Sequence, residues 1–459
     1  MENFWDSSVW GTYMLIGVLL ASLLAANILK KSVPLLRDSL IPTSVLGGIM
    51  LLILAGIYRL ATGARLFESE LFGGNGPANL EILTYHCLAL GFIASTFKTS
   101  NNKLTKKRTV EIFNTGVTTV ATYLIQAVVG FGITIIAAMV MEDFFAAAGV
   151  LLPFGYGQGT GQALNYGGIY ENEFGFEGGK SFGLTIAALG FLSASFGGVF
   201  HLNIRKKRGK LNPAGADAHV LRSEEIEALD EIPMQEGMDK MTVQIALIAV
   251  AYMLTYVLMF LLGNLLPGMK SVIYGFNFLL GVLSATLIKT IMKQLKKAGI
   301  IKKEYTNNFL LTRASNFFFD VMVVAGIAAI RLDVLGRYWG IMLILGVAGL
   351  VITYVYLRIV CTKLFPEYPE EEFLMMYGML TGTASTGIIL LREIDGDFKT
   401  PAADNMVYQN FPAIVFGFPI MLLATLAPVK PYLTLGLLTL FLIVMNVILF
   451  RSYIFKRKK

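Results

Sequence analysis

Eleven apolar runs, each long enough to cross a membrane as a helix, follow one another along the chain. They give a composition that is 55% hydrophobic and only 15% charged, which excludes an ordinary soluble domain. The sequence therefore predicts an all-α polytopic membrane protein with about 11 transmembrane helices. The runs cover residues 10–29, 42–60, 80–97, 109–141, 182–202, 241–262, 271–292, 308–330, 338–361, 405–426 and 432–455.

Two further apolar stretches are short and interrupted. Residues 144–170 break at Pro153 into GYGQGTGQ, and residues 373–394 carry GMLTGTASTG. Each arm has about ten residues, which as a helix crosses only about half of a ~30 Å hydrocarbon core. We therefore predict two re-entrant hairpins, whose irregular backbone needs protein or a water-filled cavity around it. The tips align without gaps, with Gly155, Gly159, Thr160 and Gly161 falling on Gly378, Gly382, Thr383 and Ala384.

The basic residues predict the orientation. With the N-terminus outside, 29 Lys and Arg residues face the cytoplasm and 7 face outside, which is the bias expected of membrane proteins. The C-terminus is then cytoplasmic, and the two hairpins enter from opposite sides. This predicts an inverted-topology repeat of two five-helix halves. The predicted parts are a first repeat (1–202, hairpin 144–170), a cytoplasmic linker (203–240), a second repeat (241–430, hairpin 373–394) and an extra C-terminal transmembrane helix with a basic tail (431–459).

The hairpin tips are the predicted substrate site, because paired broken helices in corresponding halves are typical of secondary transporters. A broken helix leaves free N–H groups that suit a carboxylate and free carbonyls that suit Na⁺. The alternative is a glycine-rich packing motif between helices. The tip residues predicted to bind substrate are Gln158, Gly159, Thr160, Gly161, Gln162, Asn165, Gly382, Thr383, Ala384, Ser385 and Thr386.

Polar residues inside the apolar runs add candidates. Asp320 lies mid-run and is interpreted as a cation ligand or a proton site, because an acid in a membrane is costly. Arg313 is placed with the substrate-binding residues, since a guanidinium binds carboxylate well, although cytoplasmic anchoring explains Arg313 and Arg392 equally. His86 is expected to be a packing residue. The predicted cation-binding residues are Asp320, Asn316, Thr381, Gln409 and Asn410.

Several classes of function have no residues to support them. The chain has two cysteines and three histidines without a cluster, and it has no nucleotide-binding motif or catalytic dyad. We therefore expect no enzyme activity, no resident metal and no cofactor. Its net charge of +7 comes from loops between apolar runs, so no nucleic-acid partner is expected.

The two five-span halves, opposed hairpins and polar linker resemble the bacterial sodium/glutamate symporters and the related sodium-coupled 2-hydroxycarboxylate transporters. The resemblance rests on GYGQGTGQ at 155–162 and GMLTGTASTG at 378–387, and it covers residues 1 to about 430. The first tip and the eleventh span depart from the family pattern.

The resemblance implies sodium-coupled symport of glutamate, or a similar small dicarboxylate, across the bacterial plasma membrane. It also implies an elevator-type alternating-access mechanism and a homodimer in the lipid bilayer, with Na⁺ as the coupling ion. Two alternatives stay open: a sodium- or proton-coupled transporter of another carboxylate such as a hydroxy acid, and an ion channel.

Overall fold

The computed structural model describes residues 3–98, 105–207, 231–233, 237–333, 335–336, 338–395 and 399–454. Across these residues the regular structure is helical, apart from one isolated bridge between Glu231 and Glu304. Among them, 10 helices are long and apolar enough to cross a membrane, or 11 when one bent pair counts as a single span. This confirms an all-α polytopic membrane protein of the predicted size.

Ten of the predicted spans each consist mainly of one helix, although residues 271–275 and 451–454 form separate short helices. Their ends carry local signals: the Thr105 side chain caps one N-terminus, Asp239 caps another, and Gly63 adopts a left-handed conformation after a third helix. The ten are α1 (Ser7–Ser32), α3 (Thr43–Thr62), α4 (Gly76–Phe97), α5 (Lys106–Val140), α8 (Gly179–Lys207), α10 (Lys240–Leu265), α12 (Asn277–Lys297), α13 (Asn308–Ala328), α14 (Trp339–Leu364) and α19 (Pro431–Leu449).

The predicted run at 405–426 is instead a bent pair of helices. It consists of α17 (Ala402–Tyr408) and α18 (Asn410–Leu426), and the chain bends by 54° between them. Pro412 explains the interruption, because it has no N–H to donate to the carbonyl one turn earlier. The short helices elsewhere are α2 (Pro34–Asp38), η1 (Leu66–Glu68), η2 (Glu70–Phe72), η4 (Pro267–Met269), α11 (Lys270–Gly275) and α20 (Arg451–Ile454).

Each interrupted stretch folds as helical segments on either side of a break. The first contains η3 (Ala146–Val150), α6 (Leu151–Gln158) and α7 (Thr160–Phe174), and the second contains α15 (Pro369–Thr381) and α16 (Ala384–Arg392). The predicted break at Pro153 is wrong. Pro153 lies in the first turn of α6, where a missing N–H costs little, and the helix breaks at Gly159.

The chain divides into two compact units. The first draws on Met1–Leu80, Leu104–Ala216 and Val323–Lys459, and the second on Glu81–Lys103 and Asp217–Met322. Each unit therefore takes helices from both halves of the sequence. The second unit has a core of small and apolar side chains from α4, α10, α12 and α13, including Ile93, Ile248, Ala285 and Leu311.

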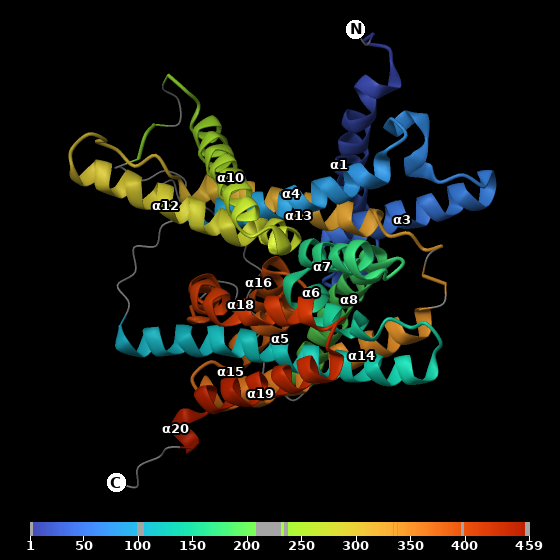
Figure 1. The fold of residues 1–459 in the computed structure, drawn as a ribbon. Coiled ribbons are helices and arrows are strands. Elements are labelled where there is room, and N and C mark those ends of the chain that lie inside the picture. Colours follow the sequence, from blue (N-terminus) through green and yellow to red (C-terminus); the bar gives the residue numbers. More distant parts are fainter. Residues whose placement is uncertain are drawn as a thin grey trace, which may run out of the picture. The chain divides into compact units, whose positions relative to one another are not determined.

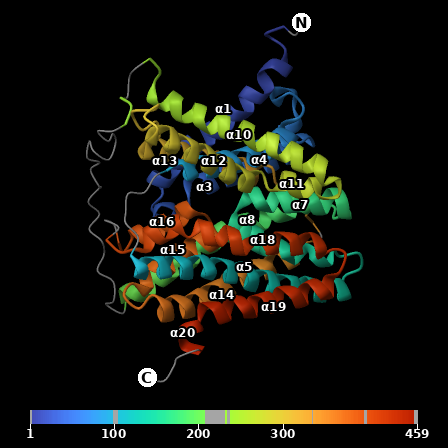
Figure 2. The same ribbon diagram turned by 60° about the vertical axis from the view of Figure 1, so that its left-hand side comes forward.

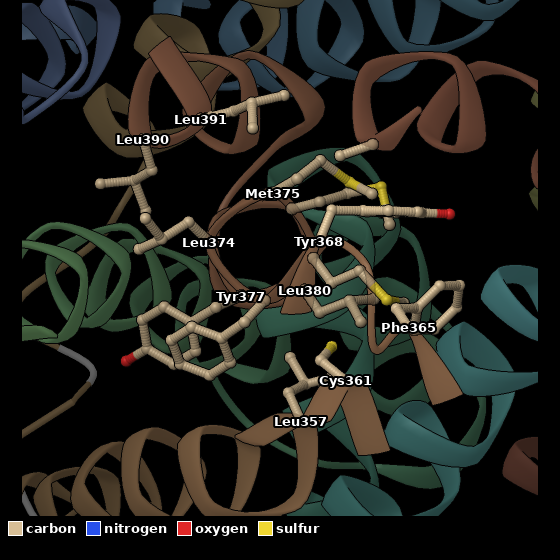
Figure 3. Packing of buried hydrophobic residues seen from close by; sticks show 14 residues of the cluster. Leu357, Cys361, Phe365, Tyr368, Leu374, Met375, Tyr377, Leu380, Leu390 and Leu391 are labelled. Atoms are coloured by element: carbon tan, nitrogen blue, oxygen red, sulfur yellow. The ribbon is translucent and has the colours of Figure 1, made fainter. Parts of the chain in front are cut away.

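The first unit holds both interrupted stretches. There α6 and α7 pack against α8 (Figure 1), and α5 runs beside α14 and α19 (Figure 2). The arms α15 and α16 approach so closely that a Cβ on Gly378 would lie 2.7 Å from the Cα of Gly387. Around α15, buried side chains of α14 and α16 form one apolar cluster, with Leu357 on α14 and Leu390 on α16 (Figure 3).

The predicted linker begins as part of helix α8, and the predicted extra helix is α19. Helix α8 continues to Lys207, beyond the predicted start of the linker at residue 203, because the basic residues after the apolar run extend it as a last turn. Most of the linker lies outside the described residues. The extra helix α19 packs along α5, and Tyr356 on α14 donates a hydrogen bond of 2.9 Å to Asn446. It is thus an integral part of the first unit.

Candidate functional site

The two helix breaks meet inside the first unit. A Cβ built on Gly159 would lie 3.9 Å from the carbonyl oxygen of Gly382. Gly190 of α8 lies at the same place, since a Cβ there would be 2.5 Å from the carbonyl oxygen of Thr381 and 3.1 Å from the ring of Tyr156. The structure therefore brings together the tip residues that the sequence predicts as one site.

The first tip depends on glycine for its backbone conformation. Gly159 has φ 80° and ψ −170°, a region that side chains with a Cβ rarely adopt. Helix α7 begins directly after it at Thr160, which is fully buried. A Cβ on Gly326 of α13 would come within 2.8 Å of the Thr160 Cβ, so the two residues are in close contact. Gly161 follows in the buried first turn of α7.

The second tip is capped by its own hydroxyl groups. Thr383 is the N-cap of α16, and its Oγ1 accepts a hydrogen bond of 3.3 Å from the Thr386 backbone N–H. The two threonine hydroxyls are 3.2 Å apart, and Thr381 donates to the Tyr377 carbonyl at 2.6 Å. Ala384 is exposed at the start of α16. The side chain of Ser385 lies outside the described residues.

Two of the residues predicted to bind ligands are buried amides with unmet hydrogen-bonding capacity. Gln162 accepts a hydrogen bond of 3.4 Å from Asn165, but its Nε2 has no partner among the described residues. Gln409 contacts the Met379 sulfur at 3.6 Å and the Asn410 oxygen at 3.2 Å, while its Oε1 has no partner there. A buried polar group without a partner costs about 1–3 kcal/mol, so both atoms are candidates for contact with a ligand. Gln158 is half-buried at the end of α6.

The side chains that hold the tips in place were not predicted from the sequence. Tyr123 of α5 donates to the Gly157 carbonyl at 3.1 Å, and Gln126, one turn later, donates to the Leu380 carbonyl at 3.0 Å. Tyr156 donates to the Gly346 carbonyl of α14 at 2.6 Å. Gln126 could have been found, because an amide in the middle of the apolar run 109–141 needs a buried partner.

Three further candidates lie on α13, in the part that belongs to the second unit. The helix is continuous through Arg313, Asn316 and Asp320, so the three share one face, and all three are exposed. The Arg313 guanidinium lies 5.0 Å from the centre of the Phe309 ring. In the same unit His86 forms a hydrogen bond of 2.6 Å with the Tyr252 hydroxyl, and in the first unit Arg392 is exposed at the end of α16.

Comparison with known proteins adds no relative. No protein-family model matches this chain, and no curated protein matches it. The function is therefore inferred from the residues and contacts described above.

Proposed function

We propose that this protein is a secondary transporter that carries glutamate, or a similar small dicarboxylate, together with Na⁺ across the bacterial plasma membrane. The observation that carries the proposal is the contact between the helix breaks at Gly159 and Gly382 within one compact unit. Secondary transporters bind their substrates at discontinuous helices of this kind. The proposal includes an outside N-terminus, a cytoplasmic C-terminus and a homodimer.

The chemistry of the tips supports this assignment. Helices α7 and α16 begin at the breaks, and their free N–H groups favour a carboxylate. Helices α6 and α15 end there, and their free carbonyls favour a small cation. The Gln162 Nε2 can donate to a substrate oxygen, and the Gln409 Oε1 can accept from a substrate ammonium or coordinate Na⁺.

The arrangement of elements also supports an inverted repeat. Equivalent helices of the two sequence halves pack against each other, α5 against α14 and α6 against α15. With 8 residues in α6 and 9 in α16, at ~1.5 Å per residue neither helix reaches across a ~30 Å core. Re-entrant arms explain why these helices pack inside the unit although they are too short to cross a membrane. An elevator-type displacement of the hairpins would carry the bound substrate.

Uptake into proteoliposomes tests the proposal. We expect labelled glutamate, or another small dicarboxylate from a panel that includes hydroxy acids, to accumulate only when an inward Na⁺ gradient is imposed. Gly159→Val should abolish accumulation, because the branched side chain cannot adopt the backbone conformation of the tip. Gly132→Val is the matched control, since its Cβ would meet nothing within 4 Å. Uptake of no acid, or equal loss in both variants, would contradict the proposal.

The coupling ion is tested separately at Asp320. If its carboxylate binds the coupling cation, Asp320→Asn should remove accumulation driven by the gradient while the protein still inserts and folds. The matched control is Glu70→Gln, which neutralises an exposed acid outside the predicted cation-binding residues and should leave accumulation unchanged. Unchanged sodium dependence in Asp320→Asn would assign Asp320 a structural role.

A further inference from the structure

Glu372 is a buried acid at the beginning of α15 that the proposed mechanism does not use. Its side chain has no exposed surface, in contrast to the neighbouring glutamates, which are partly exposed. Glu370 accepts from Arg358 at 2.6 Å and also binds Arg205 and His201, so its charge is balanced by a cluster of its own. Glu372 faces a different set of side chains.

Within the part of the chain that the structure describes, the groups that bind Glu372 directly are neutral. The Thr115 hydroxyl of α5 is 2.8 Å from Oε1, and the Asn405 amide of α17 donates to Oε2 at 3.1 Å. The same amide donates to the Tyr368 hydroxyl at 3.1 Å, and Tyr368 belongs to the apolar cluster of Figure 3. An ionised carboxylate buried among neutral groups costs several kcal/mol, whereas a protonated one does not.

Nearby charges do not balance an ionised Glu372. On α5, Arg108 forms an ion pair of 2.6 Å with Glu111 and therefore offers little net charge. The thiol of Cys361 on α14 and the phenol of Tyr368 are the other titratable groups that face it. On α8 and α14 the cationic side chains bind Glu370, as described above, and on α17 Asp404 is exposed.

The Thr115 hydroxyl gives independent support. Its Oγ1 is 3.0 Å from the Glu111 carbonyl oxygen as well as 2.8 Å from Glu372. A hydroxyl has one hydrogen, so Thr115 either shares that hydrogen between the two oxygens or donates it to the carbonyl and accepts a hydrogen bond from a protonated Glu372. A metal cation bound by both Thr115 and Glu372 would lie between their oxygens and hold them farther apart. The geometry thus favours a proton.

The amide of Asn405 is a second group that can accept a hydrogen bond from a protonated Glu372. Asn405 is fully buried, and its Oδ1 has no hydrogen-bond partner among the described residues. Amide oxygen and nitrogen are distinguished only by their hydrogen bonds, so a flipped amide would place the oxygen toward Glu372. A protonated carboxyl could then donate to it.

We propose that Glu372, with Thr115 and Asn405, forms a proton-binding site at the base of the second hairpin. The proton comes from water and forms an O–H bond on the carboxylate, and the reverse step returns it to water. The further claim that this exchange accompanies each transport cycle rests on the proposed function. The occupancy of the site by a proton does not rest on the proposed function.

Infrared difference spectroscopy of the full chain in lipid nanodiscs tests the occupancy. We expect the carbonyl stretching band of a buried protonated carboxyl at pH 7, lost in Glu372→Gln and retained in Glu367→Gln, an exposed acid that pairs with Lys107 of α5. Thr115→Val keeps the carboxyl and should shift the band, because one hydrogen bond is removed. This second variant serves if Glu372→Gln does not fold. A wild-type protein without the band, or a band that persists in Glu372→Gln, would overturn the proposal.

The role in transport has its own measurement. In proteoliposomes, Glu372→Gln should still exchange labelled for unlabelled substrate, because the carboxamide imitates the neutral acid. It should lose net uptake, because no proton can be released. If no acid is transported by the wild type, the proposed function fails while the infrared result still decides the proton site. Net uptake at the wild-type rate in Glu372→Gln would overturn the coupling role.

Discussion

The side-chain amide of Gln126 donates a hydrogen bond of 3.0 Å to the carbonyl oxygen of Leu380, two residues before the helix break at Gly382. Its other hydrogen reaches the Thr353 hydroxyl at 2.8 Å. Gln126 is fully buried, so this one side chain links α5, α14 and the second hairpin away from water. We interpret Gln126 as a positioning residue, because it contacts the hairpin backbone.

Replacing Gln126 with leucine should destabilise the second tip. The Leu380 carbonyl and the Thr353 hydroxyl would both lose a buried partner, which costs about 1–3 kcal/mol. The free energy of unfolding by denaturant in detergent micelles measures this loss. Gln294→Leu, at an exposed position of α12, is the control and should change it little. Equal losses in the two variants would mean that the hydrogen bonds of Gln126 are not important for stability.

Alanine at Gly159 should destabilise the first tip through its backbone alone. The new Cβ would have ordinary contact with its nearest neighbour at 3.9 Å, but the positive φ of 80° with ψ −170° costs a residue with a Cβ about 1–3 kcal/mol. Gly132→Ala, inside helix α5, should instead be neutral or stabilising by about 0.5–1 kcal/mol. The thermal unfolding of both variants checks the opposite signs, and a stable Gly159→Ala protein would contradict this account of the tip.

The spans and the tips could be predicted because their signals are local. Apolar runs of sufficient length predicted ten helices, and the glycine- and threonine-rich tips predicted interrupted helices, although the first break lies at Gly159 and not at Pro153. Thr383 was predicted to bind a ligand, but its hydroxyl also caps α16, because threonine is a common N-cap residue. Pro153 was taken for a helix breaker, although proline is tolerated in a first turn.

The partners of the buried polar groups could not be predicted, because they come from distant parts of the chain. Gln126 and Leu380 are 254 positions apart, and Thr115 and Glu372 are 257 apart. Only the packing of α5 against α15 brings these pairs together. Periodicity and composition contain no information about which helices pack side by side, so the two compact units could not be predicted from the sequence.

Acid should weaken the loop between α13 and α14. Asp333 accepts a hydrogen bond of 2.6 Å from Arg65 and forms an ion pair of 3.2 Å with Arg59. Burial alone would raise the pKa of Asp333, but the hydrogen bond and charge of Arg65, with the charge of Arg59, lower this pKa below its ordinary value. A carboxyl with a lowered pKa in the folded state stabilises the protein above its unfolded pKa of about 4 and loses that contribution as the pH falls through the folded value.

The measurement is the stability of Asp333→Asn relative to the wild type at two pH values. At pH 7 the variant should be less stable by about 1 kcal/mol, because the ion pairs are only partly buried. Near pH 3 this difference should shrink, since the wild-type carboxyl is then becoming protonated. Glu70→Gln, at an exposed acid in the neighbouring η2, should show no such convergence. A constant difference across the range would mean that the charge of Asp333 is not what stabilises the loop.

The hydroxyl of Thr383 has two possible uses that substitution can separate. As the N-cap of α16 it needs only an acceptor for the Thr386 N–H, and valine, which has none, should cost about 0.5–2 kcal/mol of stability. Asparagine supplies an acceptor at the cap but no hydroxyl. If the hydroxyl also binds substrate or Na⁺, Thr383→Asn should be nearly as stable as the wild type and yet have a weaker apparent affinity.

Thr160 gives the comparison at the other tip, where the backbone conformation comes from Gly159 and the hydroxyl is not the cap. Thr160→Val keeps the shape that packs against Gly326, so its stability should change less than that of Thr383→Val. A lost ligand contact should raise half-saturation for substrate or Na⁺ about five- to a hundredfold, which corresponds to ~1–3 kcal/mol. Titrations of uptake by folded Thr160→Val and Thr383→Asn decide the matter. Unchanged half-saturation for both ligands in both variants would mean that these two hydroxyls do not bind the ligands.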